Sequence, residues 1–66
     1  MMSKTIVRTY DSVEALANVE EDLLATGIEQ EQILVDKTNK QVKVVVPAAA
    51  EPEIVEILDR HRPVGQ

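Results

Sequence analysis

Few side chains of this chain have the chemistry of a catalytic or metal-binding site. His61 is the only histidine and there is no cysteine, so neither a Cys/His metal set nor a thiol nucleophile can form. Ser3 and Ser12 fall at a chain end and a helix cap, where no triad with the histidine can be argued. Gly27 and Gly65 do not make a phosphate-binding loop. We therefore expect no catalytic, cofactor-binding or metal-binding residues and no enzymatic activity.

The carboxylates are numerous, but their spacing does not match a cation site. They gather at residues 20–22 and 51–56 without the Asp-x-Asp-x-Asp-Gly loop that calcium sites use, which indicates a solvated acidic surface. Glu20 differs because it falls within an apolar helical arc. Either its head group reaches water, or it pairs with Arg8 or Lys43 of another copy, or its pKa is raised.

Length and charge limit the classes of partner. A chain of 66 residues forms one small domain, expected over residues 1–66 with residues 1–3 and 63–66 loosely ordered. The net charge of −5 and the single aromatic residue, Tyr10, argue against nucleic acid, and the charge also argues against an anionic membrane surface. No apolar run is long enough to span a bilayer and the first ten residues lack a signal-peptide core, so we expect a cytoplasmic protein.

Residues 32–46 give the clearest structural signal, a β-hairpin. Apolar residues recur at every second position, at Ile33, Val35, Val42, Val44 and Val46. Residues 37–40 form a polar turn in which Asn39 best tolerates a left-handed conformation. The predicted register pairs Asp36 with Gln41 and Val35 with Val42, so that the β-branched side chains share one face.

Residues 4–10 predict a first strand whose inward face is ambiguous. If Arg8 points to solvent, Val7 faces the core together with the neighbouring threonines, while Ile6 and Tyr10 lie on the outer face. The opposite choice buries Ile6 and Tyr10 but brings Arg8 inward. We favour the first arrangement because it leaves the charge in water.

Two helices are predicted. The first begins at Asp11, with Glu14 at the capping-box spacing, and runs to Thr26 before Gly27 ends it in a left-handed conformation. Its apolar stripe is centred on Leu16, Val19 and Leu23 and broadened by Val13, Ala17 and Leu24.

The second helix has Pro52 in its first turn and ends before Pro63. Its apolar face is formed by Ile54, Ile57, Leu58 and His61, with Val55 on the flank. His61 is expected to close the edge of the core, with a pH-sensitive contact as the alternative.

The element order predicts an α+β fold with a three-stranded antiparallel sheet in spatial order 1-3-2 and both helices on one face. This βαββα arrangement is similar to the ferredoxin-like fold lacking its last strand. The first strand then has an open edge and the other sheet face has no cover, which favours self-association. The expected interface consists of Ile6, Arg8, Tyr10, Leu34, Lys43 and Val45.

The runs Arg8 to Leu16, Leu23-Leu24, Gly27-Ile28 and Ile33 to Val35 resemble the opening of the general stress protein-like domain of small bacterial proteins. That domain's glycine-rich insertion is absent here. The resemblance implies a bacterial origin and a small cytoplasmic accessory role.

The element order also resembles ACT-type regulatory domains, in which an effector binds at a dimer interface. Their Gly-rich turn after the first strand is replaced here by residues 10–12. Two functional hypotheses follow. The first is a homodimeric interaction module, with a basic protein as a possible further partner for its acidic helices. The second is a small-ligand sensor with its effector near Tyr10, Glu20 and Arg8.

Overall fold

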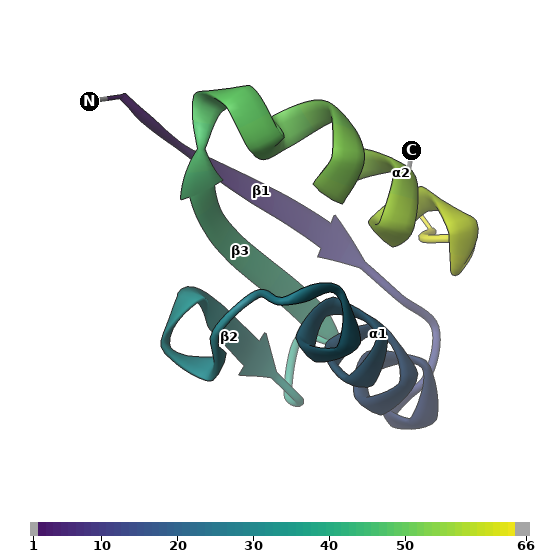
Figure 1. Cartoon of the computed structure of the whole chain (residues 1–66). Helices are drawn as coiled ribbons and strands as arrows, with labels where there is room; N and C mark the ends of the chain where they lie inside the picture. Colours follow the sequence, from purple (N-terminus) through teal and green to yellow (C-terminus); the bar gives the residue numbers. More distant parts are fainter. Residues whose placement is uncertain (1, 65–66) are drawn as a thin grey trace.

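The computed structural model describes residues 2–64 and shows the predicted α+β fold, a three-stranded antiparallel sheet with two helices (Figure 1). The elements are β1 (Ser3–Thr9), α1 (Val13–Thr26), β2 (Ile33–Asp36), β3 (Gln41–Pro47) and α2 (Glu51–Arg60), with 3-10 turns at Gln30–Gln32 and Ala48–Ala50. The terminal segments predicted to be loosely ordered include Met1, Gly65 and Gln66, which lie outside the described residues.

The sheet has the strand order β1-β3-β2, as the sequence predicts. In the hairpin, Ile33 pairs with Val44, Val35 with Val42, and Asp36 with Gln41, so the predicted register is confirmed. Strand β1 runs antiparallel to β3, with Ile6 opposite Val44 and Arg8 opposite Val42. The side chains of Val42, Val44 and Val46 therefore enter the core together, with exposed fractions of 0%, 0% and 1%.

The hairpin turn corrects one detail of the sequence prediction. The left-handed residue is Lys40, with φ of 54°, and not Asn39. Asn39 instead binds back to Asp36, because its backbone N–H and its Nδ2 both donate to the Asp36 carboxylate, at 3.2 and 2.8 Å. This Asx-type contact closes the turn one residue earlier and leaves the left-handed position to the residue that follows.

The inward face of β1 is the opposite of the one we favoured. Ile6 and Tyr10 are buried, with exposed fractions of 4% and 1%, and Val7 points outward with 38% exposed. Arg8 lies on the same side as Ile6 without becoming an unpaired buried charge. Its Nε donates to Oδ1 of Asp59 in α2 at 3.0 Å, which removes the physical reason for turning it to solvent.

The N-cap of helix α1 lies one residue later than predicted, and the helix ends where predicted. Its N-cap is Ser12, whose Oγ accepts from the backbone N–H of Ala15 at 3.1 Å, so Asp11 does not cap it. Gly27 follows in a left-handed conformation with φ of 113°. The backbone N–H of Ile28 then donates to Leu23 O at 3.1 Å, the predicted return of the chain onto the last turn.

The core lies between the sheet and the two helices. From α1 only the predicted centre of the stripe is buried, while Val13, Ala17 and Leu24 are exposed, which corrects the predicted width. Tyr10 and the apolar residues of α2 fill the rest. The buried side chains are Ile6, Tyr10, Leu16, Val19, Leu23, Ile33, Val42, Val44, Val46, Ile54, Ile57 and Leu58.

Helix α2 follows the sequence prediction closely. Pro52 occupies its first turn, Val55 packs at the flank of the core, and His61 is the C-cap residue. The Nε2 atom of His61 lies 2.9 Å from Oδ2 of Asp22 in α1. Nη1 of Arg60 is 3.6 Å from the same oxygen, so the C-terminal end of α2 is held against α1 by a shared carboxylate.

Candidate interaction surface

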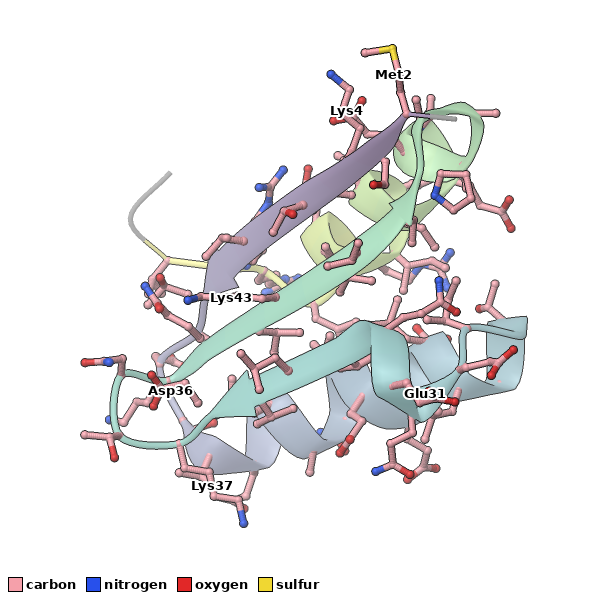
Figure 2. The ribbon with its side chains drawn as sticks, turned by 90° about the vertical axis from the view of Figure 1, so that its left-hand side faces the viewer. Met2, Lys4, Glu31, Asp36, Lys37 and Lys43 are labelled. Carbon is pink, nitrogen blue, oxygen red and sulfur yellow. The ribbon has the colours of Figure 1, made fainter. Side chains whose placement is uncertain are left out.

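The surface with the strongest functional signal is the sheet face opposite the helices, which we call the open face. Figure 2 views the molecule from this side, with the strands in front of both helices. Its side chains alternate along each strand with those of the core. They are Ser3, Thr5, Val7 and Thr9 of β1, Leu34 and Asp36 of β2, and Gln41, Lys43, Val45 and Pro47 of β3.

Three large apolar residues lie exposed on this face. Leu34, Val45 and Val7 have exposed fractions of 60%, 44% and 38%. Lys43 lies between two of them, because the register places it opposite Val7 on one side and Leu34 on the other. The centre of the open face is thus an apolar cluster around one ammonium group.

The one acidic side chain on this face is Asp36, at its hairpin end (Figure 2). The hydrogen bond from the Asn39 side chain lowers the pKa of Asp36 below its usual value, and the backbone N–H of Asn39 acts in the same direction. Since both carboxylate oxygens already accept hydrogen bonds from Asn39, Asp36 serves mainly to close the turn.

The open edge of β1 is partly blocked by the chain itself. The backbone N–H of Val64 donates to Thr9 O at 2.7 Å, and Nη1 of Arg8 donates to Val7 O at 2.9 Å. In an antiparallel strand, alternate residues direct their backbone groups to the same side. The contact at Thr9 therefore places the outward groups of β1 at Ser3, Thr5, Val7 and Thr9, and only the first two residues remain without such a contact among residues 2–64.

The other edge of the sheet is short. Strand β2 has four residues, and beyond its first residue the side chain of Gln32 continues the contact with β3, its Nε2 donating to Val45 O at 3.0 Å. A short edge strand gives little backbone to an incoming strand. Neither edge therefore offers as much surface to a partner as the open face.

The predicted interface residues separate into two groups. Leu34, Lys43 and Val45 lie together on the open face. Ile6 and Tyr10 lie in the core, and Arg8 lies on the helix side in contact with Asp59, so these three do not share the surface.

Val7 belongs to the cluster, but the predicted interface did not include it. The favoured arrangement turned Arg8 to solvent and therefore placed Val7 toward the core. The signal that identifies it is Asp59, an acid at the end of α2 that accounts for an inward arginine.

The buried hydroxyl of Tyr10 has a hydrogen-bond partner inside the fold. It donates to Leu58 O at 2.6 Å, joining the end of β1 to α2. Burial raises the pKa of Tyr10 to about 12, since the tyrosinate would lose its hydration. The hydroxyl is therefore committed to the fold and is not presented at a surface.

Glu20 and His61, the two polar residues that stand out in the helical patterns, have partners within the chain. Glu20 is half-buried and its Oε2 accepts from Nε2 of Gln30 at 3.3 Å. His61 is the C-cap residue of α2 and its Nε2 lies 2.9 Å from Oδ2 of Asp22. The sensor hypothesis needs Tyr10, Glu20 and Arg8 around one effector, and each of these side chains is already engaged, by Leu58, Gln30 and Asp59 respectively.

Within residues 2–64, no group of three or more histidine or acidic side chains is arranged to hold a metal ion, and this part of the chain forms no pocket. None of the helices in the same range has the length and apolar character that crossing a bilayer requires.

Comparisons with known proteins add nothing to the geometry. A scan against protein-family models and searches of the curated proteins and of the solved structures found no match. The resemblance to the general stress protein-like domain remains a prediction of the sequence.

Proposed function

We propose that this protein is a non-enzymatic interaction module that associates with further copies of itself through the open face, a homodimer being the smallest assembly. The single observation that carries this proposal is the exposed cluster of Val7, Leu34 and Val45 around Lys43. An antiparallel sheet that faces water normally presents polar side chains on that side. Here the middle of the face is apolar, which favours burial against a partner.

The open face is preferred to pairing between two β1 edges. An edge-to-edge dimer would have to displace Val64 from Thr9 and Arg8 from Val7 O before the strands could meet along their length. Contact through the open face needs no such change, because the apolar side chains there are already exposed. Association through the open face therefore has the smaller energetic cost.

The size of the face sets the expected strength of association. Strands of seven residues at about 3.3 Å per residue, placed about 4.8 Å apart, give a face of about 300 Å² in projection. A standard stable interface buries about 800 Å² from each partner. The association should therefore be weak and concentration-dependent, in the micromolar range or weaker.

Sedimentation equilibrium from about 10 µM to about 1 mM protein tests the proposal in a range suited to such affinities. We expect the wild-type mass to rise with concentration and the Leu34→Glu variant to remain a monomer throughout, because a carboxylate would then enter the apolar cluster. Ala49→Glu is the matched control, since it adds the same charge at an exposed position outside the open face and should associate as the wild type does.

Two results would contradict the proposal. One is a wild-type chain that stays monomeric at about 1 mM, where a weak interface should already be populated. The other is a Leu34→Glu variant that associates as strongly as Ala49→Glu. A metabolite that raises the melting temperature on addition would instead favour the sensor hypothesis, since only ligands of the folded state do so. The bacterial origin and the cytoplasmic location remain predictions of the sequence.

A further inference from the structure

A second unpartnered apolar surface lies on α1. Val13, Ala17 and Leu24 are all exposed, the first and last with exposed fractions of 43% and 40%. Successive residues of a helix are rotated by about 100°, which places these three side chains within about 40° of one another. We call this row the α1 stripe. It is separate from the buried side of the same helix, formed by Leu16, Val19 and Leu23.

The stripe lies on the flank of α1 that faces away from α2. Asp22 contacts Arg60 and His61 of α2, and it lies about half a turn around the helix from Val13. On the stripe's own side, Glu20 contacts Gln30 in the turn that precedes β2. Both large side chains of the stripe keep about two fifths of their surface exposed in the part of the chain that the structure describes.

The surroundings of the stripe are acidic. Helix α1 contains Glu14, Glu20, Glu21 and Asp22 and has no lysine or arginine. Glu20 and Glu21 lie on either side of the stripe by helical rotation. An apolar row with carboxylates beside it needs a partner surface that is apolar and basic.

At its centre the open face has that composition. Among the side chains on this face, the one base is Lys43 and the one acid is Asp36, whereas Lys4 and Arg8 lie on the helix side of β1. Lys43 lies at the centre of the open face, and Lys37 is exposed at its hairpin end. Lys40 is directed to the start of α1 instead, because its Nζ donates to Asp11 O at 3.5 Å. Asp36, the one acid, is occupied by Asn39.

Symmetric pairings of either surface with itself bring like charges together. Two open faces stacked about a two-fold axis along β3 would place Lys43 against its own copy. Two α1 stripes would bring the glutamates of both helices together with no base between them. Like charges across an interface oppose association, whereas complementary charges favour it.

We propose that the association is head-to-tail, with the α1 stripe of one copy docked on the open face of the next. This inference rests on the proposed function and adds the identity of the second surface. Leu24 and Val13 would lie on the cluster of Val7, Leu34 and Val45, and Glu21 beside the stripe would face Lys43. Lys43 of a second copy would thus supply the base that the acidic helix lacks.

A head-to-tail contact has a consequence for the size of the assembly. The two surfaces lie on different sides of the molecule, because the open face is the sheet surface opposite the layer that contains α1 (Figures 1 and 2). Two copies therefore cannot satisfy both surfaces of each other in one two-fold contact. The assembly grows past the dimer, as a ring if the rotation closes or as an open chain if it does not.

Complementation between two variants tests the inference. Leu34→Glu disables the open face and keeps the stripe, and Leu24→Lys disables the stripe and keeps the open face. Both positions are exposed, and circular dichroism on each variant checks that it is folded. We expect each variant alone to associate at least tenfold more weakly than the wild type. An equimolar mixture should form a heterodimer and nothing larger.

The control on α1 is Ala25→Lys, which adds the same charge at the neighbouring exposed position, about 100° away from Leu24 around the helix. It should associate as the wild type does. A Leu24→Lys variant that also associates as the wild type does would overturn the head-to-tail inference and leave the proposed function standing. A wild-type chain that never associates would remove both.

Salt dependence gives a second readout that requires no variant. Screening weakens attraction between a basic and an acidic surface and weakens repulsion between two like surfaces. We therefore expect wild-type association to weaken at least threefold between about 0.02 and about 0.5 M salt, over which the Debye length falls from about 20 Å to about 4 Å. Association that strengthens over this range would contradict the head-to-tail contact.

Discussion

Both faces of the sheet carry apolar side chains from the same three strands, and these side chains differ in what lies over them. Val42, Val44 and Val46 are buried under the helices, whereas Val45 of the same strand is 44% exposed. The alternation of side chains creates both faces at once, but it does not determine which apolar residues will be covered. The apolar side chains on the covered face contribute to the stability of the fold. Those on the open face are available to contact a partner.

Two neighbouring leucines of α1 should show the largest difference between the covered and the open side of the helix. Leu23 is fully buried and Leu24 is 40% exposed. Leu23→Ala should lower the free energy of unfolding by about 2 to 5 kcal/mol, because it removes core contacts and leaves a cavity. Leu24→Ala should change it by less than about 0.5 kcal/mol.

Urea denaturation at low protein concentration, where the chain is monomeric, measures both values. A small domain has a total stability of only roughly 3 to 10 kcal/mol, so Leu23→Ala should leave a substantial unfolded population. Equal losses in the free energy of unfolding for the two variants would contradict the assignment of Leu23 to a covered side of α1 and of Leu24 to an exposed side.

Tyr10 extends the comparison to a polar group on the covered side. Tyr10→Phe removes the hydroxyl that donates to Leu58 O at 2.6 Å and leaves that carbonyl without the bond. We expect a loss of about 1 kcal/mol in the free energy of unfolding, the usual net value of a buried hydrogen bond. A variant as stable as the wild type would show that the hydroxyl does not join β1 to α2.

The same residue gives a pH dependence with a defined sign. Burial raises the pKa of Tyr10 from 10.0 to about 12 in the folded chain, so the folded state holds this proton more tightly than the unfolded state. The corresponding stability is fully present below pH 10.0 and is lost as the pH rises toward about 12. The difference in unfolding free energy between wild type and Tyr10→Phe should therefore shrink over this window, as measured by denaturation at several alkaline pH values.

Much of the covered face could be predicted from the sequence, because its signals are local. Residues 32–46 alternate without interruption, and a slip by one residue would place Lys43 in the core, so the hairpin register was determined. Gly27 and Ile28 ended α1 where the helix pattern stops. Each of these predictions depends on neighbours within a few residues.

The open face was only half predicted, because its composition depends on a contact between distant residues. Whether Ile6 or Val7 enters the core is decided by Arg8, and Arg8 turns inward because Asp59 is there to receive it. The predicted width of the buried stripe on α1 was wrong for a similar reason. The sheet covers the side of Leu16, Val19 and Leu23 and α2 lies on one flank, whereas Val13 and Leu24 on the other flank remain 43% and 40% exposed.

The contact between Arg8 and Asp59 is itself testable by a double-mutant cycle. Arg8→Met keeps the aliphatic stem and Asp59→Ala removes the acceptor, and we expect a coupling free energy of about 0.2 to 1 kcal/mol because Asp59 is half exposed. Thermal and urea unfolding of the four chains measure it. A coupling of zero would mean that burial of the stem, and not the charge pair, decides the face of β1.

The smallest expected effect lies at the hairpin end of the open face. The hydrogen bonds from Asn39 lower the pKa of Asp36, so the contribution of its carboxylate to stability is present above the unfolded-state pKa and is lost as the pH falls through the lower, folded-state value. In Asn39→Ala the Asp36 pKa should rise toward its ordinary value. An NMR titration of the side-chain carboxyl carbon measures it, and an unchanged pKa would show that Asn39 is not its principal partner.

The most direct test of the central claim is a dilution series of amide NMR spectra of the wild-type chain. Association through the open face predicts concentration-dependent shifts at Val7, Leu34, Lys43 and Val45, with little change at the buried residues of β3. Shifts confined to Ser3 and Thr5 would place the contact at the free edge of β1, and spectra that do not change with concentration would show no association. Either result would contradict the assignment of the open face as the surface through which this protein acts.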